Sequence, residues 1–461
     1  MDDKIEMTRE EIINQMQQNE IIKDDIEAVD DEIINIASSK RNLVTDKADP
    51  TIESLNAKFI RGKLVLQPDY QRKFVMKPQI ASKLIESILL DIPLPTVYFA
   101  EEDDGTWSVI DGQQRLTAII SFITGKFLYD NKEFKLSGLN VLSELNRKTY
   151  KELEESYQEK IMNTSIRAII IKKESNEDIK FEIFERLNTG STPLNEDEIR
   201  NTIYRGKYMN LLNELEKNEI FDKIVDKPNF KKRMLYKGMI LRFFAFYEKS
   251  YEGYKPSMKQ FCNKHLKRFR NMDDDQIEEY KKIFKDTLDM VNMVFGNNAF
   301  RRMVKDEHSN NFLWIKTRIN MALYDIQMYG FTKYKKEQII PHMDEIREAM
   351  YELMTSNQDF IDAIEIRTSN EDMVMRRFRM WLDKLNKIVS SEKNLRFFST
   401  EIKEKLYNAD STCKLCGQKI LNIDDAQVDH KLPYSKGGKT EIENAQITHR
   451  YCNQHKNNRE E

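Results

Sequence analysis

The spacing of hydrophobic and polar positions changes along the chain, and a first clear pattern lies between about residues 51 and 205. Short β-like runs alternate there with stretches of helical spacing. Residues 96–100 are predicted to form a strand, Asp104-Gly105 a tight turn, and residues 107–110 the returning strand of a hairpin. This region is therefore expected to be α/β or α+β.

From about residue 206 to 395 the apolar positions recur in steps of three and four, which predicts helices almost throughout. The clearest apolar stripe consists of Ile277, Tyr280, Phe284, Leu288, Val291 and Phe295. A second stripe, of Phe243, Phe244 and Tyr247, is typical of a hydrophobic core rather than of a ligand site. We therefore expect a largely α-helical middle region.

These changes divide the chain into four segments, because 461 residues are too many for one ordinary core. Residues 1–50 are predicted to be an acidic helical arm that is broken at Pro50, and residues 51–205 a mixed domain. Residues 206–395 are predicted to be a helical connector domain, and residues 396–461 a small last domain. The fold class expected for the whole chain is α+β.

Composition limits the class of protein further. Charged residues make up 33% of the chain, with only 14 glycines and 10 prolines, which is typical of a helix-rich soluble protein. No apolar run approaches the roughly 20 residues that span a bilayer. The polar, acidic start does not resemble a secretory signal. We therefore expect a cytoplasmic protein without a membrane partner.

The net charge of −3 does not by itself favour a nucleic-acid partner, but the charges are segregated along the chain. Basic stretches with interleaved aromatic residues occur at 231–237, 264–270, 375–380 and 449–459. Such stretches can neutralise phosphates and stack on bases. Each of them, taken singly, could equally be a solvated helix face.

Three of the four cysteines lie within the last fifty residues, and in a cytosolic protein such clustering favours a metal over disulfides. Cys413 and Cys416 form a CxxC pair, and His449 and Cys452 repeat its spacing. Such ligands make a closed tetrahedral zinc site, which can contribute on the order of 10 kcal/mol to folding. The remaining Cys262 is expected to be a buried apolar residue.

The residues between these two pairs favour a catalytic site over a purely structural zinc ribbon. They include Asp429-His430, a P-x-S-x-G-G loop at residues 433–438, Asn444 and a closing C-N-x-x-K motif. This combination, over about residues 405–460, resembles the HNH (ββα-metal) nucleases. A zinc-stapled domain without catalysis remains the alternative.

The resemblance implies a role for each of these residues. His430 would be the general base that takes a proton from the attacking water. Asp429 and Asn453 would hold one catalytic Mg²⁺ or Mn²⁺ ion beside the phosphate. Asn444 would brace the loop that orients the histidine.

Two positions depart from the family pattern. His449 stands where the family more often has cysteine, which zinc tolerates. Asn453 stands where many members have histidine, so His455 is an alternative metal ligand. Lys456 and Arg459 could contact the flanking phosphates.

A second motif, DGQQR at residues 111–115, lies between a predicted strand and a predicted helix at residues 114–123. Backbone N–H groups at a helix N-terminus, with an arginine and two amides nearby, suit an anion such as phosphate. Alternatively, Asp111 and Arg115 only pair with each other to fix the turn. The chain contains no Walker-type phosphate loop.

Two further motifs accompany DGQQR, namely QPDYQR at residues 67–72 and FERLNTG at residues 184–190. Together they resemble the DGQQR-motif domain of GmrSD-type, modification-dependent (type IV) restriction systems, over about residues 51–205. The resemblance implies a ParB/sulfiredoxin-like core that binds or hydrolyses a nucleoside triphosphate and controls DNA cleavage. It also implies a nucleotide site lined by Asp111, Gln113, Gln114 and Arg115, with Arg72 and Asn188 as weaker candidates.

The two ends of the chain together predict a nucleotide-regulated, metal-dependent DNA endonuclease of the phage-defence type. Its expected partners are a triphosphate and foreign or modified double-stranded DNA, and binding at the first domain would change the position or freedom of the last. The acidic N-terminal segment could mediate homo-oligomerisation. Three alternatives remain: a DNA-binding or toxin-like regulator that does not cut, an RNA-directed nuclease, and a ParB-like nuclease role for the first domain.

Overall fold

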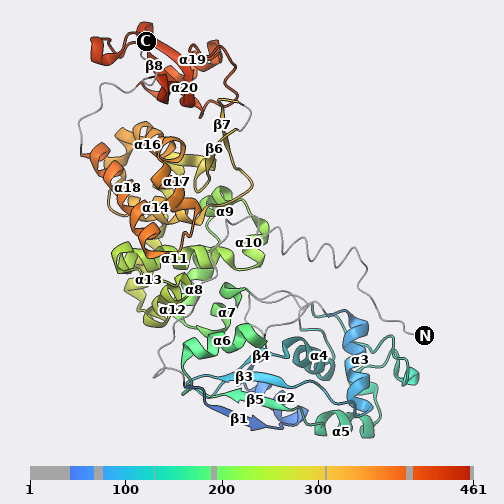
Figure 1. Ribbon diagram of the computed structural model, residues 1–461. Helices are drawn as coiled ribbons and strands as arrows, with labels where there is room; N and C mark the ends of the chain where they lie inside the picture. Colours follow the sequence, from blue (N-terminus) through green and yellow to red (C-terminus); the bar gives the residue numbers. More distant parts are fainter. Residues whose placement is uncertain are drawn as a thin grey trace. The chain divides into compact units, whose positions relative to one another are not determined.

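The structure is a computed structural model that describes residues 42–66, 76–128, 130–187, 195–306, 309–390 and 398–456 (Figure 1). These residues form two compact units. The N-terminal unit runs to Met209 and includes residues 232–235, while the C-terminal unit takes up the rest of the described chain. Most of the predicted acidic arm lies outside the described residues, as do two candidate nucleotide-site residues, Arg72 and Asn188.

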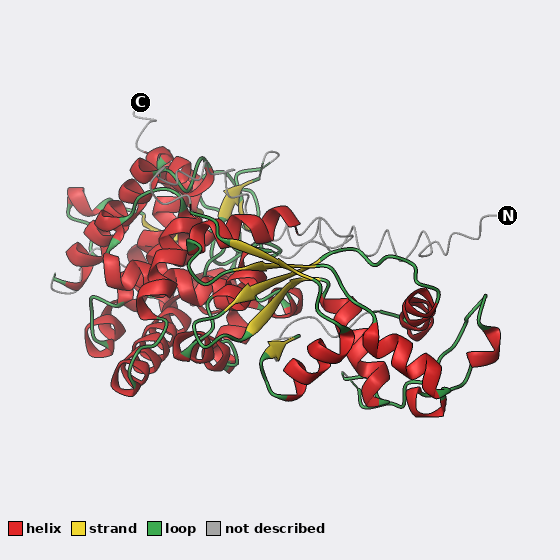
Figure 2. Ribbon diagram, turned by 90° about the horizontal axis from the view of Figure 1, so that it is seen from below, coloured by secondary structure: helices red, strands yellow, loops and turns green. Residues whose placement is uncertain are grey.

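The N-terminal unit contains a five-stranded mixed sheet, whose strands are among those drawn in yellow in Figure 2. The strand order is β1 (Thr45–Ala48), β5 (Ala168–Ile171), β3 (Val97–Glu101), β4 (Trp107–Asp111) and β2 (Leu64–Val65). β3 runs parallel to β5 and antiparallel to β4, so the carboxyl end of β4 lies beside the start of β3.

The hairpin predicted before the DGQQR motif is present. The N–H of Glu102 donates to the carbonyl of Thr106 at 2.8 Å and closes the turn between β3 and β4. Asp104 accepts a hydrogen bond from the Thr106 N–H at 2.9 Å, and Gly105 has a φ of +76°. Both features are typical of tight turns, where aspartate caps the backbone and glycine adopts the left-handed conformation. The helix predicted next is α4 (Gln113–Thr124).

One continuous apolar core joins the sheet to helices α2 (Ile52–Ile60), α3 (Pro78–Leu89), α4 and α5 (Glu155–Asn163). Among its fully buried members are Ile52, Ile85, Phe99, Ile119 and Ile161. The unit also contains α6 (Glu177–Leu187) and α7 (Glu196–Ile203). Both β4 and α4 contribute to this core, and the turn between them carries the DGQQR motif.

The last part of the C-terminal unit is a ββα module, which we define as the described residues 398–456. It begins with α19 (Thr400–Ala409), continues with the antiparallel strands β8 (Ala426–His430) and β9 (Ala445–His449), and ends with the short helix α20 (Arg450–Gln454). Its own buried apolar cluster is small and consists of Cys413, Ile420, Ala426 and Ile447.

The rest of the C-terminal unit is a helical module, defined as the described residues 210–231 and 236–390. Its elements are α8 (Lys207–Leu215), α9 (Glu219–Val225), α10 (Pro228–Lys232), α11 (Leu235–Lys249), α12 (Met258–Phe269), α13 (Asp274–Phe295), α14 (Met321–Phe331), α15 (Lys336–Ile339), α16 (Met343–Ser356), α17 (Gln358–Glu365) and α18 (Glu371–Val389). Between α13 and α14 a hairpin of β6 (Met303–Lys305) and β7 (Phe312–Trp314) interrupts the helices, which the sequence pattern did not predict.

The predicted apolar stripes of this module are core positions with two exceptions. In α13 the buried members are Tyr280, Phe284, Leu288, Val291 and Phe295, whereas Ile277 is only half-buried. In α11 Phe243 and Phe244 are buried, and Tyr247 is half-buried. The predicted Cys262 is buried in α12.

The observed architecture confirms the α+β class and the ββα organisation of the last module. The hairpin β8–β9 followed by α20 supplies two strands and one helix in the predicted order. In the described part of the chain, no helix combines the length and apolarity needed to cross a bilayer.

A buried ion triad fixes the packing of three helices in the helical module. The Asp325 carboxylate of α14 accepts two hydrogen bonds from the Arg242 guanidinium of α11, each at 2.6 Å. The same carboxylate accepts a third from Arg377 of α18, at 3.0 Å. Asp325 and Arg377 are fully buried. The Asp325 carboxylate therefore offsets the free-energy cost of burying two guanidinium groups.

We predict that Asp325→Asn destabilises the C-terminal unit by about 3–5 kcal/mol, because it leaves two buried cations without a counter-charge. The unfolding midpoint of this unit should fall by on the order of 10 °C in a thermal scan of the whole chain. The matched control is Asp383→Asn, at an exposed position of α18, which should change stability by less than about 0.5 kcal/mol. Equal midpoints for the two variants would contradict the prediction.

Candidate functional site

Three cysteines and one histidine of the ββα module converge on one point. One ligand atom from each of Cys413, Cys416, His449 and Cys452 lies within 4.8 Å of all the others. The Nδ1 atom of His449 is 3.4 Å from the Cys416 sulfur and 3.8 Å from the Cys452 sulfur. A tetrahedron with Zn–S bonds of about 2.3 Å and Zn–N bonds of about 2.0 Å has S–N edges of about 3.5 Å. The cluster therefore fits a zinc ion.

Local backbone geometry explains why the first pair can bind one ion. The N–H of Gly417 donates to the carbonyl of Cys413 at 2.9 Å, and the N–H of Cys413 donates to the carbonyl of Gln418 at 2.9 Å. Gly417 has a φ of +75°, which side chains with a Cβ rarely adopt. The resulting knuckle turns both sulfurs of the CxxC pair toward β9.

The protonation chemistry of the cluster also suits a cation. Burial, together with the neighbouring Cys416 and Cys413 sulfurs, raises the pKa of the Cys452 thiol to about 12. Burial lowers the pKa of His449, which keeps its imidazole neutral and able to bind a metal. A divalent ion would favour the thiolate that burial disfavours, so these donors and a zinc ion complement each other.

His430 lies at the end of β8, opposite Ala445 of β9. Its Nε2 atom is 3.0 Å from the hydroxyl oxygen of Thr440, and its ring centroid is 4.4 Å from that of the buried Phe398. Burial lowers the pKa of His430, and Lys456 adds to the effect, although Asp429 opposes it. The imidazole is therefore neutral near pH 7, the form that can accept a proton.

Asp429 precedes His430 on the same strand, and its carboxylate accepts hydrogen bonds from one cationic group and one amide. Its Oδ2 atom accepts hydrogen bonds from Gln446 and from the Lys456 ammonium, each at 2.8 Å. The Asp429 side chain is 13% exposed. Both donors bind Oδ2, and a carboxylate oxygen is the type of ligand that a hard divalent ion prefers.

Asn453, the second candidate ligand, lies on α20, which packs against β8. Among the described residues no hydrogen bond joins Asn453 to Asp429. His455, its alternative, stacks on Tyr451 at 4.1 Å between ring centroids, and its Nδ1–H donates to the Tyr451 carbonyl at 2.9 Å. Arg459 lies outside the described residues.

Asn444 closes the loop between β8 and β9. Its carbonyl oxygen accepts from the Leu432 N–H at 2.9 Å, and its amide nitrogen donates to the carbonyls of Leu432 and Lys439 at 3.1 and 2.8 Å. Gly438 makes this closure sterically feasible, since a Cβ atom there would lie 1.9 Å from the Leu432 oxygen. The loop that follows His430 is thus tied back to the hairpin at its other end.

In the N-terminal unit, Asp111 ends β4 and Arg115 lies in the first turn of α4. Arg115 donates to the Asp111 carboxylate at 2.9 Å and to the carbonyls of Pro95 and Thr96. Gly112 has a φ of +90°, and a Cβ atom there would lie 2.5 Å from a Val97 methyl group. The ion pair between Asp111 and Arg115, which would fix the turn, is therefore present.

Two amides of this motif remain available to a ligand. Gln113 is half-buried and Gln114 is exposed, and neither side chain makes a hydrogen bond to a described residue. Both lie in the first turn of the 12-residue helix α4, where N–H groups are oriented for an anion.

Some residues that touch the candidate site were not found from the sequence. Gln446 could have been found, because pairing of the two strands places it opposite Asp429. Thr440 and Phe398, which contact His430, carry no recognisable motif.

Comparisons with known families agree with the two motif sets. Residues 52–205 match the family model of the GmrSD restriction endonuclease N-terminal domain, and residues 413–459 match that of the HNH endonuclease. No curated protein matches the chain. The predicted resemblance is thus confirmed at both ends. The chain joins a GmrSD-type N-terminal domain to a C-terminal HNH endonuclease domain, in the manner of a restriction-type HNH endonuclease.

Proposed function

We propose that this protein is a metal-dependent DNA endonuclease of the modification-dependent restriction type, regulated by a nucleoside triphosphate. The observation that carries the proposal is a neutral His430 beside the Asp429 carboxylate, on a hairpin stapled by a Cys/His cluster. Foreign or modified double-stranded DNA is the proposed substrate. The proposed place of action is the cytoplasm.

His430 acts as the general base in this proposal. When its Nε2–H donates to the Thr440 hydroxyl at 3.0 Å, the Nδ1 atom keeps the lone pair that accepts a proton from water. The water attacks phosphorus, and the 3′-oxygen leaves. A divalent ion held by Asp429 and Asn453 would supply stabilisation of the charge that develops on the phosphate and the leaving oxygen.

The N-terminal unit supplies regulation in this proposal. Gln113 and Gln114 at the start of α4 contact the triphosphate, while Arg115 holds the turn that presents them. Arg72 and Asn188 remain candidates for the same site. Homo-oligomerisation through the N-terminal segment remains a further proposal.

The proposal predicts that His430→Ala lowers the rate of DNA cleavage by about 10²–10⁴-fold, the usual contribution of a positioned general base. Nicking of unmodified and modified plasmid and phage DNA, with Mg²⁺ or Mn²⁺ and with or without triphosphate, measures this rate. The matched control is His342→Ala, in the helical module, which should cleave like the wild-type protein.

Absence of cleavage by the wild-type protein on every DNA would instead favour the regulator that binds without cutting. Cleavage that persists in His430→Ala would move catalysis to the N-terminal unit. Parallel digestion of RNA distinguishes an RNA-directed nuclease.

Zinc content provides a second prediction. The wild-type chain should bind one zinc ion, because its described residues hold one Cys/His cluster. Cys413→Ser should lose most of this zinc and unfold the ββα module, since such sites contribute on the order of 10 kcal/mol to folding. Cys262→Ala, at the cysteine outside the cluster, should keep it. Elemental analysis after dialysis measures the zinc content of both variants. A Cys413→Ser variant that keeps one zinc ion per chain would contradict the assignment.

Nucleotide binding provides a third prediction. The double variant Gln113→Ala/Gln114→Ala should weaken triphosphate binding by tenfold or more, about 1.4 kcal/mol, without loss of fold, because neither side chain is hydrogen-bonded to the described protein. The control Gln79→Ala removes an exposed glutamine from the first turn of α3, another helix of the same unit. Titration with a fluorescent triphosphate measures the affinity. Equal affinities of double variant and control would refute this site.

A further inference from the structure

The short helix α20 carries one candidate ligand of each of the two metal sites. It has five residues, Arg450–Gln454, and includes the cluster ligand Cys452 and the candidate metal ligand Asn453. A helix of this length is not stable by itself in water. Its position must therefore be set by what it contacts.

Described residues of the helical module make hydrogen bonds, an ion pair or a cation–π contact with four of the five residues of α20. The contacts join Arg450 to Glu348 (2.7 Å), Tyr451 to Lys305 (3.6 Å, Nζ to ring centroid), Cys452 to Asn310 (3.7 Å, Sγ to Nδ2) and Gln454 to Thr355 (3.1 Å). They come from α16 and from the β6–β7 hairpin. Asn453 is thus held in place by its neighbours on both sides.

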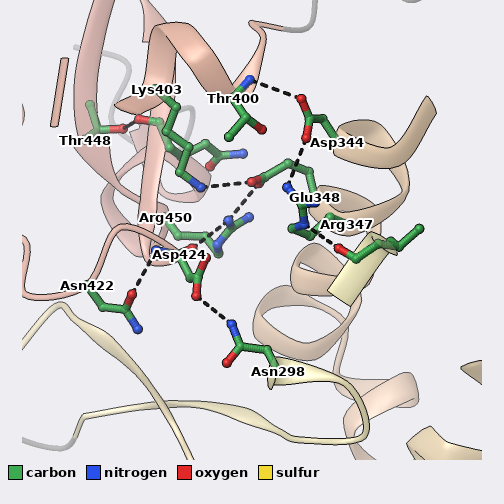
Figure 3. Close-up of polar contacts among 12 residues, drawn as sticks. Asn298, Asp344, Arg347, Glu348, Thr400, Lys403, Asn422, Asp424, Thr448 and Arg450 are labelled. Carbon is green, nitrogen blue, oxygen red and sulfur yellow. Dashed lines mark hydrogen bonds and ion pairs between the residues drawn. The ribbon is translucent and has the colours of Figure 1, made fainter. Parts of the chain in front are cut away.

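The contact between Glu348 of α16 and Arg450 is an ion pair (Figure 3). The Glu348 carboxylate accepts from Arg450 of α20 at 2.7 Å and from Lys403 of α19 at 3.0 Å. Burial alone would raise the pKa of Glu348, but Arg450 and Lys403 outweigh it and lower the pKa. Arg450 is 0% exposed, so its charge relies on this carboxylate and on the Asp424 carbonyl, which accepts from it at 2.9 Å.

A second set of contacts fixes the segment that leads into β8. The Asp424 carboxylate accepts from Asn298 and from the Trp314 indole, each at 2.8 Å. The N–H of Leu421 donates to the side chain of Asn311 at 3.0 Å. Figure 3 marks the hydrogen bond between Asn298 and Asp424 with a dashed line. The strand that bears Asp429 and His430 and the helix that bears Asn453 are therefore both held by the helical module.

We propose that the helical module is a structural part of the nuclease site and that Glu348 is a positioning residue for it. Through Arg450, Glu348 sets the place of α20, and through it the places of Cys452 and Asn453. The contacts of Glu348 with Arg450 and Lys403, and those of Asp424 with Asn298 and Trp314, hold the ββα module on the helical module. The inference rests on the proposed nuclease function.

The test compares Glu348→Gln with Glu352→Gln in the full-length chain. Glu352 lies one turn further along α16 and pairs at the surface with Lys384, so it matches Glu348 in helix and chemistry but not in contact with α20. In the absence of DNA, Mn²⁺ binding is followed by the loss of the free-ion EPR signal, and zinc release by a chromogenic chelator.

Glu348→Gln should raise the Mn²⁺ concentration for half-saturation by about tenfold or more, the effect expected when a partner that orients a metal ligand is lost. It should also release zinc faster than Glu352→Gln. In cleavage assays the half-saturating Mn²⁺ concentration should rise in parallel, while the rate at saturating Mn²⁺ changes much less. A general loss of folding would lower the rate at every concentration instead.

Asn310→Ala provides a second variant, which keeps every charge of the Glu348 cluster. It should also speed zinc release, because it removes the donor to the Cys452 sulfur. If both variants bind Mn²⁺ and release zinc like Glu352→Gln, the positioning role is refuted. A wild-type protein that never cleaves nucleic acid would refute the proposed function alone, since the Mn²⁺ and zinc measurements do not depend on cleavage.

Discussion

The ββα module has too small an apolar core to be stable by itself, and the rest of the C-terminal unit depends on this constraint. Its buried apolar cluster consists of Cys413, Ile420, Ala426 and Ile447. Small domains with so limited a core are marginal unless a metal, a disulfide or a partner adds stability. The chain supplies two such additions. One is the Cys/His cluster, and the other is the face of the helical module, where the Glu348 carboxylate accepts hydrogen bonds from Arg450 and Lys403.

Much of the local structure followed from the sequence because it depends on neighbours along the chain. The alternation before residue 111, the turn at Asp104-Gly105 and the steps of α13 are local signals, and the structure contains all three. The four ligands of the Cys/His cluster lie close together in the structure, as their spacing predicts. The β6–β7 hairpin was missed because strands of three residues are too short to show a period of two.

The contacts between modules could not be predicted in the same way. Glu348 is one of several acidic residues on an amphipathic helix, and nothing nearby in sequence distinguishes it from Glu352. Its partner Arg450 lies about a hundred residues further along, within a basic stretch for which the sequence left open either contact with phosphates or a solvated helix face. In the structure Arg450 is buried and binds a carboxylate, so that part of the basic stretch serves packing rather than recognition.

Gly438 limits the substitutions that the loop between β8 and β9 can accept. A Cβ atom there would overlap a backbone oxygen at 1.9 Å, and no side-chain rotamer can relieve a clash with backbone. Its neighbour Gly437 has open space around it and is restricted only by a φ of +88°, which asparagine also tolerates. In a saturation library the two adjacent glycines should thus behave differently. Position 437 should admit a few residues, whereas position 438 should change only together with the length of the loop that Asn444 closes.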